Sequence, residues 1–360
     1  MKRAGLGVLF LGLGAALQAG AAAAPTVVER LFARGLYPHL GARLGGVSAA
    51  VPFSLAEFGL AGGLVLLVLR LRGFLRQGRL RSWGAALGGL AGDCTLALGA
   101  GFLLFLLSWG LNYQREPFAR SAGLGVRPPR PGELGALSLV LVERANMLRA
   151  GVVEDERGMM RGAGGAPSVL VRAEAGLRAA AARYPFLQGP GARPKPVLLS
   201  EPLSYLGITG MYIPFTGEPN VNTAVPDVDL PFTTSHELAH QRGFAREDEA
   251  NFVAYLACRL HPDADFNYAG ALAASSYVQS ALAATDRAAA SRVGTARSPA
   301  VRRDLDGLRA WAERHQGWMM RLSERVNDAY LKGRGQAEGI LSYGRMVDLL
   351  LAERRAEASR

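Results

Sequence analysis

The stretch AALGGLAGDCTLALGAGFLLFLLSW (residues 85–109) decides the class of this protein, because it is long, apolar and carries a single charged residue. A helix needs about 20 mostly apolar residues to cross a hydrocarbon core of about 30 Å. Two earlier stretches, residues 5–25 and 50–69, approach or exceed that length. The sequence therefore predicts three transmembrane helices within a membrane domain of residues 1–112.

The first apolar stretch has a second interpretation. It begins with Lys2 and Arg3 and ends in four small residues, Ala21–Ala24, a pattern also typical of a secretory signal peptide that is cleaved. Two acidic residues, Glu57 and Asp93, lie near the ends of the other two stretches, where we expect them to be interfacial or paired with a neighbouring arginine.

Basic residues predict the orientation. Positive side chains are retained on the cytoplasmic side of a membrane. The short loop between the second and third stretches is rich in arginine, namely Arg70, Arg72, Arg76, Arg79 and Arg81. We therefore expect a multi-pass protein of the cytoplasmic (inner) membrane, with its N-terminus in the cytoplasm and its C-terminal domain outside. The same loop is expected to contact anionic membrane lipid.

Composition excludes several other classes. The chain has 360 residues, 49% of them hydrophobic and 20% charged, which excludes a disordered protein. Two cysteines, Cys94 and Cys258, are too few for a disulfide scaffold. The net charge of +11 is concentrated in residues 1–112, which hold ten basic and three acidic residues. The remainder is only weakly basic and has no base-stacking motif, so we expect no nucleic-acid partner.

The rest of the chain has the pattern of a soluble, mainly α-helical domain. Residues 113–133 are rich in proline and glycine and are predicted to form a linker, followed by a domain of residues 134–360. Helical patterns dominate that domain. Residues 196–224 differ, because β-branched and aromatic residues alternate there with glycine and proline, which predicts short strands and a hairpin.

One motif carries chemistry: Ser-His-Glu-Leu-Ala-His at residues 235–240. Side chains four residues apart lie on one face of a helix, so His236 and His240 would be neighbours across one turn. Two neutral imidazoles at that spacing can bind Zn²⁺, and Glu237 beside them can act as the general base of a metallopeptidase. Gly243 is expected to end this helix in a left-handed conformation.

A catalytic zinc site commonly has three protein ligands and an open position. The acidic run Glu247-Asp248-Glu249 begins the next helical pattern, and Glu247 is the preferred third ligand, with Glu249 as the alternative. Asn251, four residues after Glu247, could hydrogen-bond a ligand imidazole. The competing interpretation is that acids in a first turn only complement the helix dipole.

Several segments also carry a family resemblance over nearly the whole chain: Trp109–Tyr113, Gly210–Glu218, Leu230–Phe252, Asn327–Lys332 and Ser342–Arg345. In these segments the sequence resembles a bacterial membrane family known as domain of unknown function 3810, regarded as HExxH zinc metallopeptidases. The element starting at Glu247 is also similar to the Glu-x-x-x-Asp/Asn element of gluzincin peptidases. The resemblance implies a zinc ion and a zincin-like helical domain with a small β-hairpin or sheet (α+β).

The expected function is a membrane-anchored zinc metallopeptidase that cleaves a peptide or protein substrate outside the membrane, a cell-wall peptide crosslink included. Glu237 would take a proton from the attacking water. The oxyanion donor is left open among four tyrosines: Tyr212, Tyr268, Tyr330 and Tyr343. The segment 208–214 could be an edge strand that pairs with an extended peptide, or an ordinary hairpin. The alternative function is a non-hydrolytic receptor or assembly factor with a structural or sensing zinc. The oligomeric state is not predicted.

Overall fold

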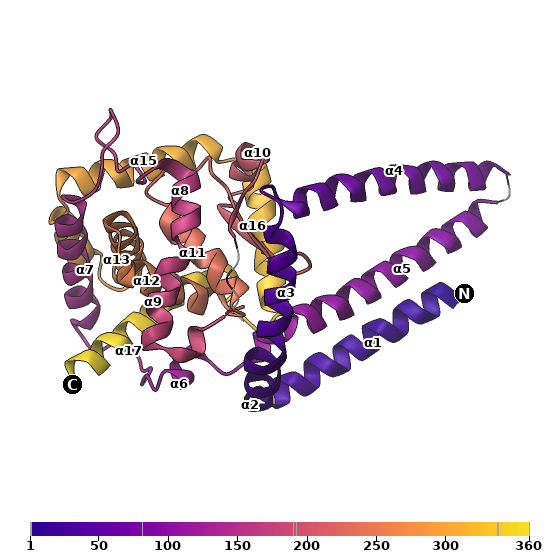
Figure 1. The fold of residues 1–360 in the computed structure, drawn as a ribbon, viewed down its shortest axis with the longest axis horizontal. Helices are drawn as coiled ribbons and strands as arrows, with labels where there is room; N and C mark the ends of the chain where they lie inside the picture. The colour runs from indigo at the N-terminus through magenta and orange to yellow at the C-terminus, as the bar shows by residue number, and fades with distance from the viewer. Residues whose placement is uncertain (1, 81, 190, 192, 337, 360) are drawn as a thin grey trace.

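A computed structural model describes residues 2–80, 82–189, 191, 193–336 and 338–359. Three of the described helices are long and apolar enough to cross a membrane: α1 (Lys2–Ala23), α4 (Leu55–Leu80) and α5 (Trp83–Ser108). Figure 1 shows them projecting together from one side of a globular part, which we define as residues 109–359. α1 packs along α5, whereas α4 diverges from α5 toward the globular part.

The second long helix begins later than the predicted stretch 50–69. Residues 50–54 form turns instead, because Pro52 has no backbone N–H and α4 starts only at Leu55. Of the two acidic residues, Asp93 is paired with arginine as expected, whereas Glu57 accepts the backbone N–H groups of Leu198 and Leu199. Asp93 forms ion pairs with Arg3 and Arg70 at 2.6 and 2.7 Å. The predicted basic loop is largely helical, because α4 continues to Leu80 and includes four of its five arginines. The fifth, Arg81, lies outside the described residues.

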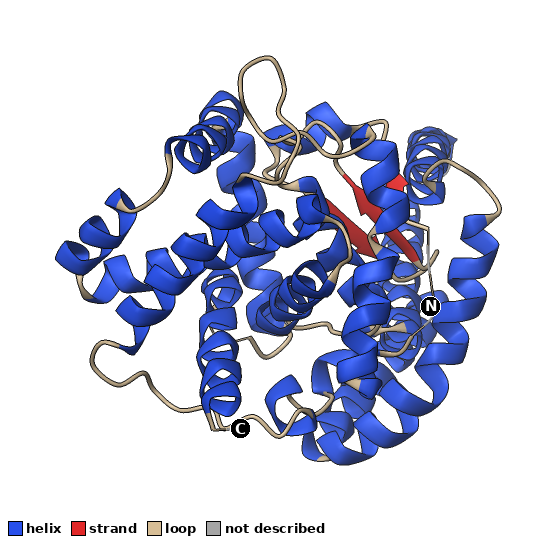
Figure 2. Ribbon diagram, turned by 60° about the vertical axis from the view of Figure 1, so that its left-hand side comes forward, coloured by secondary structure: helices blue, strands red, loops and turns tan. Residues whose placement is uncertain are grey.

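The globular part is mainly helical, as predicted (Figure 2). Its first helices are η2 (Gly110–Gln114), α6 (Phe118–Ser121), α7 (Glu133–Arg149), α8 (Gly165–Arg172), α9 (Glu174–Arg183), η3 (Pro185–Leu187) and α10 (Ser200–Tyr205). The others are α11 (Leu230–Gln241), α12 (Glu247–Leu260), α13 (Ala264–Thr285), α14 (Arg287–Thr295), α15 (Pro299–His315), α16 (Trp318–Gly333), η4 (Gly339–Arg345) and α17 (Met346–Ala358).

The predicted hairpin is part of a small mixed sheet. It has the order β1 (Lys195–Pro196), β3 (Glu218–Val221), β2 (Gly210–Ile213). β1 is parallel to β3 and β2 is antiparallel to it, with Tyr212 opposite Pro219. β2 therefore lies at an edge of the sheet, and it packs against α11.

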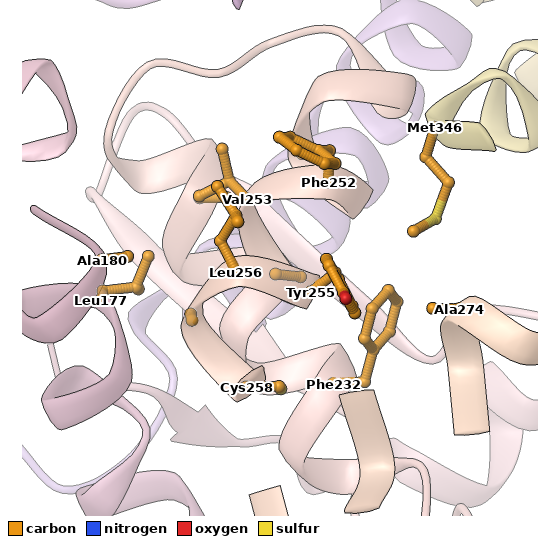
Figure 3. Packing of buried hydrophobic residues seen from close by; sticks show 14 of the residues in the cluster. Leu177, Ala180, Phe232, Phe252, Val253, Tyr255, Leu256, Cys258, Ala274 and Met346 are labelled. Atoms are coloured by element: carbon orange, nitrogen blue, oxygen red, sulfur yellow. The ribbon is translucent and has the colours of Figure 1, made fainter. Parts of the chain in front are cut away.

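The core of the globular part surrounds α12, which is buried along nearly its whole length. Figure 3 shows its side chains Phe252, Tyr255 and Leu256 among residues of neighbouring helices, with Phe232 of α11 and Met346 of α17 close by. Full burial of one such side chain stabilises the fold by about 1.5–3 kcal/mol. This packing fixes α12 against α11 and so sets the distance between their polar residues.

The segment between the first two spans folds onto the globular part. It forms α2 (Pro25–Val27), the π-helix η1 (Val28–Leu36) and α3 (Tyr37–Ala49). The buried Lys195 ammonium donates to the carbonyl oxygen of Ser48 at 2.7 Å. The buried Glu218 carboxylate accepts the backbone N–H groups of Leu55 and Ala56, the first residues of α4. The small sheet thus binds the N-terminal end of α4 through Glu218 of β3.

The predicted linker 113–133 is structured at its beginning. Tyr113 and Phe118 are buried, and Arg115 is buried as well. The proline and glycine content of the segment indicates a linker. The burial of these residues has no local signal, because the residues that they contact lie far along the chain.

Candidate metal centre

The helix α11 carries the two histidines on one face, as their spacing predicts. The ring centroids of His236 and His240 are 4.5 Å apart. Gly243 follows with a φ of +81°, a conformation that ends the helix at little cost for glycine. A Cβ atom at this position would lie 3.0 Å from the Asn112 side chain, so the turn packs tightly against the end of the third span.

The turn at Gly243 brings α12 back across α11, and this places Glu247 between the histidines. Its Oε2 lies 3.3 Å from Nε2 of His236 and 3.5 Å from Nε2 of His240. These three donor atoms all fall within 4.8 Å of one another. Because two imidazole nitrogens and one carboxylate oxygen are typical zinc donors, the set has the chemistry of a three-ligand site.

Neighbouring groups orient one of the two histidines, His240. The Nδ1 of His240 lies 2.7 Å from the carbonyl oxygen of Phe244, to which it can donate, leaving the Nε2 lone pair directed at Glu247. The indole N–H of Trp109 donates to the carbonyl oxygen of His240 at 3.0 Å. The Nδ1 of His236 is buried and has no hydrogen-bond partner among the described residues.

Electrostatics show that this cluster requires positive charge. Burial opposes the charged form of His240, but the Glu247 carboxylate outweighs it and raises the pKa of His240 to about 9. Burial likewise opposes ionisation of Glu247, yet the two imidazoles lower its pKa to about 2. Three converging lone pairs in a buried space repel one another unless a cation lies between them. A divalent ion bound by the three side chains would supply that charge.

Glu237 lies beside the three candidate ligands and close to the edge strand β2. It is buried, its Oε2 has no hydrogen-bond partner among the described residues, and burial raises the pKa of its carboxyl group. A Cβ atom at Gly210 would lie 2.5 Å from Oε1 of Glu237. Glycine at this position therefore allows the edge strand β2 to approach the carboxylate closely.

The two other polar residues predicted near the site have different partners. Glu249 accepts the backbone N–H of Phe118 at 2.7 Å and lies outside the three-residue cluster, so the geometry favours Glu247 over it. Asn251 was expected to hydrogen-bond an imidazole. Instead, its amide donates to the Tyr277 hydroxyl and to the carbonyl oxygen of Tyr343, because its side chain points toward α13 and η4.

The sequence of this chain matches one protein family. A family model with the description "Protein of unknown function (DUF3810)" matches residues 32–351. The chain belongs to this family. No curated protein and no solved structure matches this DUF3810 chain.

The structure separates the four candidate tyrosines. Tyr268 donates to Asp304 at 2.6 Å in a different cluster, away from the metal donors. Tyr212 and Tyr330 each form a hydrogen bond with another tyrosine hydroxyl, and the Tyr343 hydroxyl accepts one from Asn327. Burial and the Glu247 carboxylate raise the pKa of Tyr330. Tyr343 lies close enough to the site that, after burial, the Glu247 carboxylate is the main cause that raises its pKa well above the usual range. Its phenol therefore stays protonated and available as a donor.

Several residues that support the site have no local signal in the sequence. The backbone N–H of Glu247 donates to the side-chain oxygen of Gln336 at 3.2 Å. Arg115 donates to the carbonyl oxygen of Gly243 and to both carboxylate oxygens of the buried Glu29. These partners are separated by up to 128 residues, and neither a motif nor a periodicity links them.

A pocket of about 250 Å³ lies between α11 and α13. Its wall is mostly apolar and includes Phe232, Leu272, Ala273 and Tyr277. Phe232 precedes His236 by one helical turn, and the Tyr277 hydroxyl receives a hydrogen bond from Asn251. The size and apolar wall of the pocket suit an apolar side chain.

Proposed function

We propose that this DUF3810 protein is a membrane-anchored zinc metallopeptidase. The observation that supports the proposal most strongly is the convergence of His236, His240 and Glu247 beside the buried Glu237, whose Oε2 has no hydrogen-bond partner among the described residues. A purely structural zinc site would have a fourth protein ligand and no need of a general base. Among the described residues, the cluster contains three protein donors.

His236, His240 and Glu247 would hold the ion. When bound, zinc lowers the pKa of water and polarises the scissile carbonyl group. Glu237 accepts a proton from the attacking water at its free Oε2 and delivers it to the leaving amine. Its burial favours this exchange, because a raised pKa brings the carboxyl group closer to the pH at which it must both take and release a proton. The Tyr343 phenol is the proposed donor to the oxyanion.

The edge strand β2 gives the substrate a place to bind. Its outer edge is unpaired within the described sheet, and β2 packs against α11. An extended peptide could add to this edge through main-chain hydrogen bonds, with its scissile bond above Glu237. We propose that the substrate is a peptide segment, of a protein or of the cell wall, in extended conformation.

We further propose that the site lies outside the cytoplasmic membrane. Basic residues gather at the far ends of the spans, where Arg3 and Arg70 pair with Asp93. This end of the molecule is expected in the cytoplasm. The globular part lies at the opposite ends of the spans and would then be extracytoplasmic (Figure 1).

The experiment that tests the function compares three variants of the full-length chain in detergent. Zinc per chain is measured by mass spectrometry, and hydrolysis is measured with a fluorogenic peptide library. Glu237→Gln should keep zinc and lose hydrolysis, whereas His236→Ala should lose both. Glu313→Gln, an exposed glutamate on α15, should change neither.

A Glu237→Gln protein that hydrolyses as fast as the wild type would refute the peptidase mechanism. Wild-type protein that binds zinc but cleaves no member of the library would favour the receptor or assembly role.

A further inference from the structure

One face of α16 is apolar and uncovered. Trp318, Leu322 and Val326 recur every four residues and are 67%, 52% and 63% exposed. Residues at this spacing form a single stripe along a helix. Charged residues lie along one edge of this stripe and extend toward the buried side of the helix: Arg321, Glu324, Arg325, Asp328 and Lys332. The side turned to the globular part includes the fully buried Leu331.

The C-terminal end of α16 contacts the spans. Arg334, the residue after the helix, donates to the side-chain oxygen of Gln18 in α1 at 3.1 Å. Its guanidinium also lies 4.7 Å from the ring centre of Phe105 in α5. Gln18 is five residues before the end of α1, which corresponds to about 8 Å of helix at 1.5 Å per residue. That depth is within one leaflet of a hydrocarbon core about 30 Å thick.

The N-terminal end of α16 is close to the remaining span. Met320 lies against Gly207, just after α10. The residues before α10 reach α4, because the backbone N–H groups of Leu198 and Leu199 donate to the Glu57 carboxylate. α16 thus stretches from the end of α4 to the ends of α1 and α5. Figure 1 shows it on the side of the globular part that faces the three spans.

We propose that the stripe of Trp318, Leu322 and Val326 binds the lipid of the bilayer leaflet next to the globular part. A helix with an apolar flank, a charged flank and a tryptophan is typical of the membrane interface. Lipid is the occupant that the position of α16 favours, because Arg334 contacts α1 and α5 at one end of the helix and Met320 lies near the residues that bind α4 at the other. The charged flank would remain in water.

Lipid contact at α16 would also affect the candidate metal centre, because the chain after this helix contacts it. The helix continues into the segment that covers the site, where Gln336 accepts the N–H of Glu247 and Tyr343 accepts a hydrogen bond from Asn251. The segment that contains Gln336 and Tyr343 would then lie at the membrane surface. If the proposed function is correct, on which this step rests, the substrate is a peptide segment close to the membrane surface.

The test uses the full-length chain in nanodiscs of phosphatidylcholine and phosphatidylglycerol. Cys94→Ala removes the exposed cysteine, and Cys258 is buried. An environment-sensitive fluorophore is attached at Leu322→Cys or, as the matched control on the opposite flank, at Glu324→Cys. Both positions are exposed, so labelling should leave the fold intact. Lipids that carry a doxyl quencher are then added to the discs.

The Leu322 label should lose fluorescence to the quencher and shift to the blue, whereas the Glu324 label should do neither. Equal quenching at both positions, or none at Leu322, would overturn the proposal. A blue-shifted Leu322 label without quenching would instead identify a protein partner or a second copy of the chain. None of these results depends on zinc or on hydrolysis, so failure here is distinguishable from failure of the proposed function.

Discussion

Replacing Gly210 with alanine tests whether the edge strand β2 positions the general base. The added Cβ would lie 2.5 Å from Oε1 and 2.8 Å from Cδ of Glu237. Ordinary van der Waals contact begins at 3.4 Å, so either the carboxylate or the strand must move by nearly 1 Å. Misplacement of a catalytic group by about 1 Å costs on the order of 100-fold in rate. This corresponds to about 2.7 kcal/mol of transition-state stabilisation.

We therefore expect Gly210→Ala to lower kcat/KM for peptide hydrolysis by about 100-fold while the protein keeps its zinc. Overpacking should also reduce the free energy of unfolding by about 1–3 kcal/mol. The matched control is Gly135→Ala on α7, where no atom lies within 4 Å of the new methyl group. A Gly210→Ala protein with full activity and full zinc content would show that the approach of β2 to Glu237 has no role in catalysis.

Three further predictions concern stability, pH and specificity. Glu29→Ala leaves the Arg115 guanidinium buried without its carboxylate and should cost about 3–5 kcal/mol in chemical unfolding. The control Arg34→Ala removes a half-exposed partner of Glu29 and should cost less than about 1 kcal/mol. Glu247 raises the pKa of His240 from 6.5 to about 9, so the folded zinc-free protein holds this proton more tightly than the unfolded chain. The melting temperature of the zinc-free protein should therefore fall as the pH rises through that interval. A zinc-loaded sample should not follow this trend, and a flat zinc-free profile would contradict the assignment. If the pocket between α11 and α13 accepts a substrate side chain, Ala273→Phe should fill it and shift library cleavage away from bulky apolar residues without loss of zinc. An unchanged preference would exclude this pocket as a side-chain site.

The sequence predicted the parts of the site that depend on helical periodicity. His236 and His240 lie together because they are four residues apart on one helix. The position of Glu247 followed from a turn at Gly243 that returns the next helix across the first, and the structure has that turn. The three apolar helices followed from length and composition alone.

Other features of the site arise from packing between distant segments. Trp109 ends the third apolar stretch, yet its indole hydrogen-bonds the backbone of His240. Asn251 shares a helix with Glu247, but packing against α13 directs its amide to Tyr277. Residues 113–133 have the composition of a linker, whereas Phe118 is fully buried against α12. Local pattern carries no information on such long-range contacts.

The central claim is that His236, His240 and Glu247 bind one zinc ion and leave one position open. X-ray absorption at the zinc edge, measured on the full-length protein together with its metal content, tests it most directly. The account predicts one zinc per chain with two imidazole nitrogens at about 2.0–2.1 Å and oxygen ligands that include a solvent molecule. Protein that binds no zinc, or zinc closed off by a fourth protein side chain, would contradict it.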